Sequence, residues 1–215
     1  LEYNAAHRLT GYTDPEGNRH DLKYDMRNRL QSYADPLGFT STLTYLANSV
    51  QVTNPRLEST TLTFNDTGNL IRKIEPTGSV TTLGWTGNRV TSFQQPTGQV
   101  TTIVYKPTDK KGDRIEAVVS PSGNRMTYVY DAALRVQNII DATGAKGTLV
   151  WNSQGQRLAK IDPLGNTITY TYNGTNQPKG IANPEGAITT FVFDAWGNRT
   201  ALLNPVGKTS SYVYD

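Results

Sequence analysis

The chain has 215 residues, of which 36% are hydrophobic, with a formal net charge of +3 and a mean hydropathy of −0.52. It has no cysteine, which excludes disulfides and thiolate metal ligands, and no apolar run approaches the length of a membrane span. So little apolar material favours a thin sheet with one packed face over a thick core.

An aromatic residue recurs along the whole chain. The intervals are 21, 21, 19, 21, 20, 25, 21, 21, 21 and 21 residues, and the positions are Tyr3, Tyr24, Tyr45, Phe64, Trp85, Tyr105, Tyr130, Trp151, Tyr172, Phe193 and Tyr214. A period in this range is typical of repeat architectures. We therefore expect residues 1–215 to form a single array of about ten repeats, cut from a longer chain.

Most repeats contain a segment of the type X-Pro-x-Gly. Proline has a preset φ and glycine tolerates positive φ, so this segment predicts a type I turn. Three of the turns use Pro36 with Gly38, Pro163 with Gly165, and Pro184 with Gly186. Two repeats depart from the pattern, because Asn54–Leu57 lacks the glycine and Asp141–Gly144 lacks the proline, and we expect those turns to be the least well specified.

A second turn is predicted directly after each opening aromatic. Eight of the eleven positions that follow an aromatic are Asp or Asn, the exceptions being Leu46, Thr86 and Lys106. The candidate structural positions of this phase are Tyr24 with Asp25, Tyr130 with Asp131, Phe193 with Asp194, Tyr172 and Tyr214. Two turns leave two strands of six to seven residues, so each repeat is predicted to be a β-hairpin.

Alternation along the first strand predicts two unlike faces. The residue two positions before the opening aromatic is always apolar or aromatic, and the intervening positions are often threonine. On the second strand the apolar residues are three apart, for instance Leu30 and Tyr33. Since three apart in a flat strand means opposite faces, we predict a β-bulge after the second turn.

The residues give little support to catalysis. The only histidines are His7 and His20, and His20 is in strand phase with Leu22 and Tyr24, which favours a packed side chain over a catalytic base. We expect no catalytic, cofactor or metal site, hence no enzyme. The longest repeat carries the basic segment Lys106–Arg114, with Lys110 and Lys111, which we interpret as an exposed insertion at a hairpin tip; contact with a partner or nucleic acid is the weaker alternative.

Two segments carry a family resemblance. Tyr-Asp-Met-Arg-Asn-Arg-Leu at 24–30 and Tyr-Asp-Ala-Ala-Leu-Arg-Val at 130–136, each with a Pro-x-Gly turn upstream, resemble the YD repeat of the Rhs family. The same repeat occurs in the B and C components of insecticidal Tc toxins and in teneurins. The resemblance covers essentially the whole chain. It implies a continuous antiparallel sheet of hairpins that coils into a hollow shell, which encloses a C-terminal toxin polypeptide in bacterial members.

One further likeness has an ordinary explanation. The resembled shells end in a self-cleaving aspartate motif that contains Asp-Pro-x-Gly-Leu, and Asp35–Gly38 and Asp162–Gly165 match its first four positions. Phe39 and Asn166 follow instead of leucine, and both segments lie in normal repeat phase. We interpret them as turns.

The resemblance leads to an all-β, non-catalytic wall segment of a toxin-enclosing shell, in a polymorphic toxin used in competition between bacteria or against hosts. The expected partners are the rest of the shell and the enclosed toxin polypeptide, with pairing through edge strands, and with no nucleic acid and no cofactor. The protein is then expected to be secreted or displayed on a bacterial surface. The alternative is a surface-exposed module that binds carbohydrate or a partner protein through aromatics such as Trp196.

Overall fold

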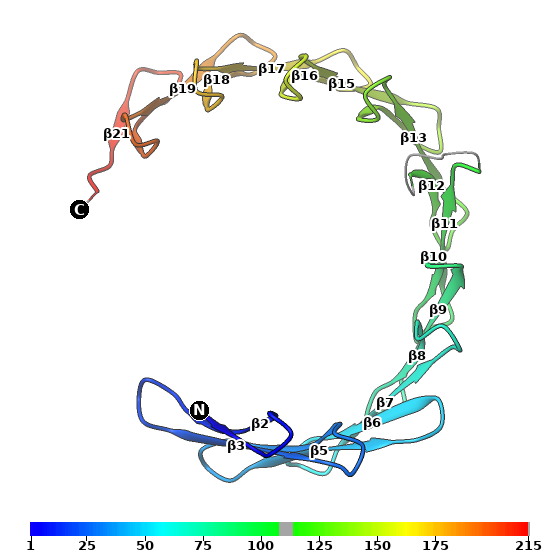
Figure 1. Ribbon diagram of the computed structural model, residues 1–215. Helices are drawn as coiled ribbons and strands as arrows, with labels where there is room; N and C mark the ends of the chain where they lie inside the picture. Colours follow the sequence, from blue (N-terminus) through cyan, green and yellow to red (C-terminus); the bar gives the residue numbers. More distant parts are fainter. Residues whose placement is uncertain (108–113, 215) are drawn as a thin grey trace. The chain divides into compact units, whose positions relative to one another are not determined.

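The computed structural model describes residues 1–107 and 114–214, which are strands joined by turns, without a helix (Figure 1). The strands form one unclosed antiparallel sheet, so the predicted all-β class is confirmed. The predicted tip residues Lys110 and Lys111 lie outside the described residues. The strands are β1 (Glu2–Tyr3), β2 (Leu9–Thr13), β3 (Arg19–Tyr24), β4 (Leu30–Ala34), β5 (Thr40–Tyr45), β6 (Ser49–Thr53), β7 (Ser59–Phe64), β8 (Leu70–Ile74), β9 (Val80–Thr86), β10 (Arg89–Gln94), β11 (Val100–Tyr105), β12 (Ile115–Val119), β13 (Arg125–Tyr130), β14 (Val136–Ile140), β15 (Lys146–Trp151), β16 (Arg157–Ile161), β17 (Thr167–Tyr172), β18 (Pro178–Ala182), β19 (Ile188–Phe193), β20 (Arg199–Leu203) and β21 (Thr209–Ser211).

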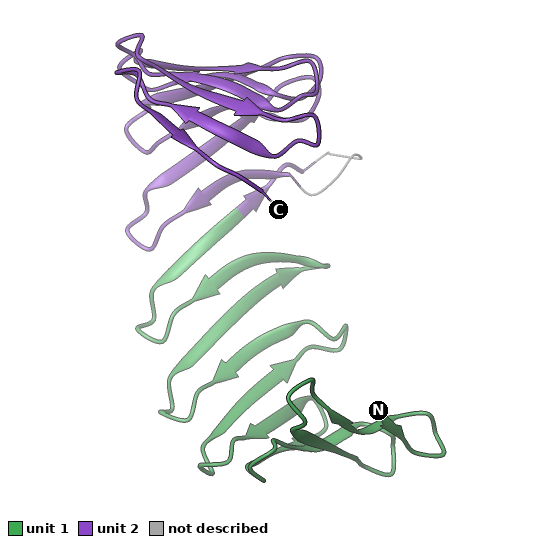
Figure 2. Cartoon of the chain, turned by 90° about the vertical axis from the view of Figure 1, so that its left-hand side faces the viewer, with its two compact units in different colours: residues 1–103 green, residues 104–215 purple. Residues whose placement is uncertain are grey.

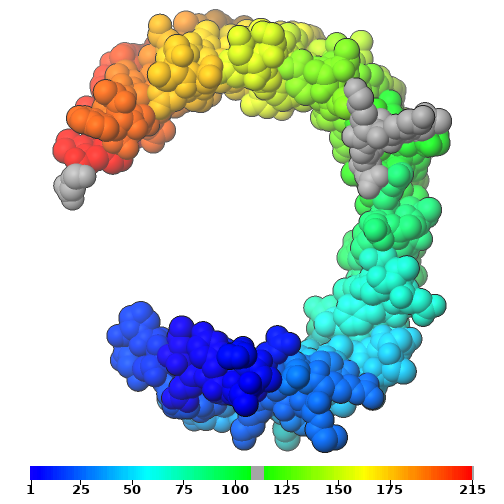
Figure 3. Space-filling view, in the orientation of Figure 1, coloured from blue at the N-terminus to red at the C-terminus, as the bar shows by residue number. Residues whose placement is uncertain are grey.

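The chain divides into two compact units, Leu1–Ile103 and Val104–Asp215 (Figure 2). Within each unit strands pair in chain order, as β3 does with β4 and β4 with β5. The colours of the space-filling view run in the same order through each unit (Figure 3). Each hairpin therefore packs on its neighbours in sequence, as in other repeat proteins. That residues 1–215 act as a single array stays a prediction. Searched over the described residues, the chain offers no helix capable of crossing a membrane.

Turns lie at both predicted phases and share one geometry. In the proline-phase turn the N–H of Gly38 donates to the carbonyl of Asp35 at 2.9 Å, and the N–H of Asp35 donates to the carbonyl of Phe39 at 3.0 Å. The turn after the aromatic repeats the pattern, with Asn28 donating to Asp25 and Asp25 to Arg29, both at 2.9 Å. At most hairpins, both edges of the ribbon are thus closed by a type I turn followed by a residue with positive φ.

The two irregular proline-phase turns keep this geometry, contrary to our expectation. Asp141 and Gly144 make the same two hydrogen bonds without a proline, and so do Asn54 and Leu57 without a glycine. The difference appears as backbone strain, because Leu57 takes the φ of +64° that glycine supplies elsewhere, such as +83° at Gly38. The backbone hydrogen bonds that close the turn outweigh the preference of its fourth residue for negative φ.

The predicted bulge is confirmed in most hairpins. In β3–β4, Lys23 faces Ser32 and Tyr24 faces Leu30, which leaves Gln31 as the extra residue. Hairpin β5–β6 lacks the bulge, since its register runs without a shift from Thr42↔Thr53 to Tyr45↔Val50. It belongs to the 19-residue repeat and has Leu46 where other repeats have Asp or Asn. The shortened repeat has lost the bulge.

The sheet is a single layer with little deep burial. Among the described residues Ala117 is the only buried hydrophobic one, and the accessible surface of 14443 Å² exceeds the roughly 9,800 Å² typical of a compact monomer of this mass. We call the face that carries the opening aromatics and the residues two positions before them the ladder face, and the opposite one the threonine face. Stability must come from half-buried contacts between neighbouring hairpins.

Candidate functional site

In most repeats the opening aromatic joins its hairpin to the one before it. Tyr24 Oη donates to the carbonyl of Leu9 at 2.9 Å, a residue 15 positions earlier. The same bond, at 2.8 to 2.9 Å and the same separation, joins Tyr45 to Leu30, Trp85 to Leu70, Tyr130 to Ile115, Trp151 to Val136, Tyr172 to Arg157 and Tyr214 to Arg199. An aromatic that carries a donor is suited to this joint because it adds a hydrogen bond to apolar contact.

The bulge explains why a backbone carbonyl can accept a hydrogen bond from the aromatic side chain. The acceptors Leu30, Val136 and Arg157 each stand just before the extra residue of their hairpin. A bulge disrupts the ladder locally, so that a backbone group there needs another partner. Phe64, whose side chain has no donor, follows hairpin β5–β6, which lacks the bulge and in which the carbonyl of Ser49 already accepts the N–H of Leu46 at 2.8 Å.

The aspartate after the aromatic holds the second turn. Asp25 Oδ1 accepts the N–H groups of Arg27 and Arg29, both at 2.9 Å. Asp131 Oδ1 accepts the N–H of Arg135 at 2.9 Å, and Asp194 Oδ1 those of Trp196 and Asn198 at 3.0 and 2.8 Å. Hydrogen bonds from the backbone N–H groups of Arg29 and Arg135 are the main cause that lowers the pKa of Asp25 and Asp131. These carboxylates are engaged in the turn itself.

An arginine links the turn to the next repeat. Arg29 pairs with Asp25 at 2.7 Å, and its guanidinium carbon lies 4.0 Å from the centre of the Tyr45 ring. Arg135 pairs with Asp131 at 2.7 Å and donates to the carbonyl of Asn152 at 2.7 Å. The Tyr-Asp…Arg-Leu pattern therefore forms one joint. Its tyrosine bonds to the preceding hairpin, its aspartate holds its own turn, and its arginine contacts the following hairpin.

The predicted proline-phase residues hold their own turns. Asp35 Oδ1 accepts the N–H groups of Leu37 and Phe39, and Asp162 Oδ1 those of Leu164 and Asn166. Gly165 and Gly186 have φ of +89° and +81°, and the N–H of Gly186 donates to the carbonyl of Asn183 at 3.0 Å. Pro36, Pro163 and Pro184 stand at the second turn position. The structure brings these residues together only within their own turns.

His20 lies in an aromatic stack. Its ring is 4.4 Å from Tyr12 and 5.8 Å from Tyr33 between centroids, and its Nδ1 is 2.6 Å from the hydroxyl of Tyr33. Its Nε2 is 3.7 Å from Asp14 Oδ2. In residues 1–107 and 114–214 no three His, Asp or Glu side chains are placed to hold a metal ion.

Two features of the ladder face were not found from the sequence. In two repeats an arginine replaces the apolar residue before the bulge, and the residue 13 positions later is tyrosine. The guanidinium carbon of Arg157 lies 4.4 Å from the Tyr170 ring centre, and that of Arg199 lies 4.8 Å from Tyr212. The constant spacing of 13 residues between arginine and tyrosine is the sequence pattern that could have predicted these pairs. A cation–π pair has replaced an apolar pair there.

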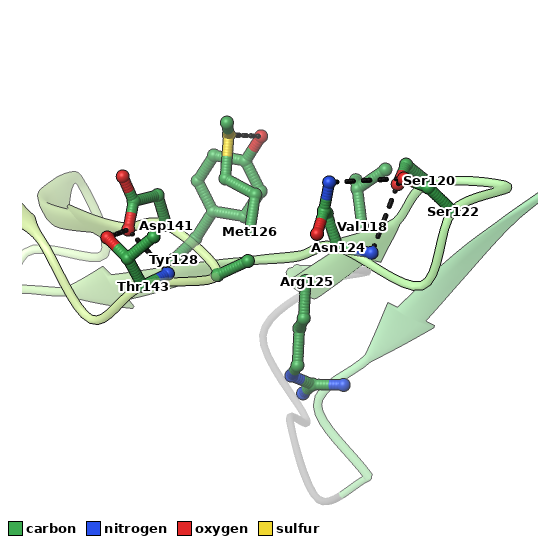
Figure 4. A pocket seen from close by; sticks show the side chains of 10 residues that line it. Val118, Ser120, Ser122, Asn124, Arg125, Met126, Tyr128, Asp141 and Thr143 are labelled. Carbon is green, nitrogen blue, oxygen red and sulfur yellow. Dashed lines mark hydrogen bonds between the residues drawn. The ribbon is translucent and has the colours of Figure 1, made fainter.

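The second feature is a hollow of about 540 Å³ between two proline-phase turns of the second unit (Figure 4). Met126 and Tyr128 form its middle. Ser120 and Ser122 lie on one side, and Asp141 and Thr143 lie on the other. A second hollow of about 520 Å³ lies beside Trp196, which is 87% exposed on the β19–β20 turn.

Comparison with known proteins places this geometry in a family. The sequence profile named Teneurin YD-shell matches residues 1–147, and the profile named RHS Repeat matches residues 151–188. None of the curated proteins compared with the chain matches it.

Solved structures show the same fold. A crystal structure of TcdB2-TccC3 aligns with a TM-score of 0.66 at 15% identity, covering 93% of this chain and 12% of that chain. TcdB2-TccC3-TEV aligns with a TM-score of 0.65 at 16% identity, and the Tc holotoxin pore of Photorhabdus luminescens aligns with a TM-score of 0.63 at 16% identity. Each alignment covers 93% of this chain and 12% of the other chain. The chain thus spans about an eighth of these relatives.

At such identity the structures establish the fold alone, whereas the profile covers more than half of the sequence. The repeated joint and the match over residues 1–147 show that this chain belongs to the teneurin YD-shell family, with Rhs-type repeats in its later part.

Proposed function

We propose that the chain is a non-catalytic wall segment of a shell that encloses a C-terminal toxin polypeptide. The observation that carries the proposal is the aromatic-to-carbonyl joint, which recurs from Tyr24 to Tyr214. A joint that recurs along the array serves the continuity of a wall.

The remaining roles follow from the same proposal. The turn carboxylates, such as Asp25 and Asp131, are occupied by turn hydrogen bonds and arginines, which supports a structural role over an enzymatic one. The partners are the rest of the shell, through edge strands that leave backbone groups unpaired, and the enclosed polypeptide. The protein is secreted or displayed by a bacterium and delivered by a secretion system.

Protease protection in the full-length protein tests enclosure. The region that follows the repeats should resist a protease while the shell is intact, and should be digested once urea opens the shell. The control is the same region expressed without the repeats. Digestion at equal rates in the two proteins would refute enclosure.

The binding-module alternative rests on Trp196, whose exposed ring borders a hollow together with Asp194, Asn198 and Tyr212. An aromatic ring with polar neighbours is suited to a sugar. Binding of a glycan that is lost in Trp196→Ala, without a change in melting temperature, is the result that would favour this alternative.

A further inference from the structure

The ladder face of the second unit leaves apolar surface open in two places. One is the hollow of about 540 Å³ lined by Val118, Met126 and Tyr128 on β12 and β13. The other is a hollow of about 420 Å³ lined by Ile181, Phe191 and Phe193 on β18 and β19. Hollows with apolar side chains in their walls can take a partner's anchoring residues, and the first of these hollows is also bordered by Ser120, Asp141 and Thr143.

The strands of the same face carry positive charge. Register places Arg157 opposite Trp151, Lys160 opposite Leu149, and Arg199 opposite Phe193, all on the ladder face. Across the part of the chain that the structure describes, none of the three cations forms an ion pair, and Arg157 Nε is buried without a hydrogen-bond partner. No strand residue of the ladder face in the described part of this unit is Asp or Glu.

The threonine face also carries strand cations, Lys146 among them, but its arginine is ion-paired. Its Arg125 pairs with Glu116 at 2.9 Å, and Figure 4 shows the Arg125 side chain pointing away from Met126 and Tyr128. Thr169 and Thr171 are exposed there, on the same strand as Tyr170. On the ladder face, apolar hollows lie on the same surface as three strand cations that form no ion pair in the described chain.

We propose that the ladder face of the second unit binds an extended polypeptide that carries apolar and acidic side chains. The inference rests on the proposed function, since this polypeptide is the enclosed one, and it assigns the ladder face to the enclosed side. Apolar side chains enter the hollows, and a carboxylate meets Lys160. Three cations among apolar side chains are too few for a nucleic-acid backbone, whose binding depends on neutralising many phosphates.

The spacing of the strands sets the pattern of the bound segment. Lys160 on β16 is three strands from Tyr128 on β13, or roughly 14 Å at about 4.8 Å per strand. Ile181 on β18 is two strands further, or roughly 10 Å. At about 3.3 Å per residue, the segment has an apolar residue, an acidic one about four positions later, and a second apolar one about three positions beyond.

A photo-crosslinker placed on either face of one strand tests the assignment. Benzoylphenylalanine replaces Tyr170 on the ladder face, or Thr169 or Thr171 on the threonine face, in the full-length protein with its own C-terminal region. The Tyr170 variant should give several-fold more crosslink to that region than the other two. Ile168, the neighbouring ladder position, serves as a second reporter if the Tyr170 variant melts early.

A charge reversal tests the acidic contact. Lys160→Glu should lower the crosslink from Ile168 by about threefold, the effect of removing one exposed ion pair. Lys146→Glu is the matched control, because Lys146 is equally an exposed strand lysine but lies opposite Ile140 on the threonine face, and it should leave the yield unchanged.

The outcomes separate the two proposals. Three results would overturn the inference and leave enclosure standing, provided that the C-terminal region is protease-resistant. The region could crosslink only from Thr169 or Thr171, it could crosslink from neither face, or its crosslink could respond equally to both lysine variants. Crosslinks from Tyr170 to nucleic acid would also overturn it. A region that is protease-sensitive in the full-length protein would overturn both.

Discussion

At the scale of residues, the contact between neighbouring hairpins depends on whether the opening aromatic side chain can donate a hydrogen bond. Tyrosine and tryptophan reach a carbonyl 15 residues back, and the phenylalanines cannot. Phe64 needs no donor, because Ser49 O is already occupied. Phe193 differs, since it follows hairpin β17–β18, which has a bulge, and the equivalent carbonyl is that of Pro178.

Phe193→Tyr should therefore stabilise the protein by about 1 kcal/mol, the net value of one hydrogen bond. Urea denaturation measures the free energy of unfolding. Phe64→Tyr is the matched control and should bring no gain. Equal effects at the two positions would show that the bulge carbonyl is not the acceptor.

Leu57 offers a test of the strain at the proline-phase turn. Its φ is +64° and its side chain is 84% exposed, so Leu57→Gly relieves strain and loses little packing. We expect a gain of about 1 kcal/mol in the free energy of unfolding. Leu164→Gly, at an exposed turn position without positive φ, should instead cost a few tenths of a kcal/mol. Destabilisation by Leu57→Gly would mean that the leucine makes a contact that outweighs its strain.

At the scale of elements, the two turns of each hairpin are alike in backbone and unlike in what they join. The second turn carries the Asp–Arg pair that reaches the next hairpin. Since backbone N–H bonds lower the pKa of Asp25 and Asp131, their stabilisation is present above the unfolded pKa of about 3.9 and is lost as the pH falls through the folded value.

Replacing Asp25 and Asp131 by Asn should accordingly flatten the loss of stability below pH 4, because asparagine keeps the turn acceptor without a titrating group. The free energy of unfolding between pH 6 and pH 3 is the measurement. Asp66→Asn removes a turn carboxylate that accepts no hydrogen bond in the described chain, and should leave the profile as it was. A double variant as acid-sensitive as the parent would contradict the assignment.

At the scale of the whole molecule, the sequence was sufficient for the fold because its information is periodic. The spacing of prolines, glycines and Asx residues gave both turns, and the three-residue spacing of Leu30 and Tyr33 gave the bulge. The missing bulge of β5–β6 could have been predicted from Leu46 and the 19-residue interval together.

The joint itself could not be predicted, because it depends on the bulge carbonyl and on a partner 15 residues away. The cation–π pairs of Arg157 and Arg199 likewise required the register between strands. Such contacts depend on side-chain positions across the sheet, which a repeat pattern in one dimension does not contain.

We propose above all that these hairpins form a wall around a polypeptide. Electron microscopy of the full-length protein with its own C-terminal region tests it most directly. We predict that residues 1–215 form part of a closed β-sheet wall, with density for the polypeptide on one side of the sheet only. A sheet with solvent on both faces and the C-terminal region outside it would contradict the claim.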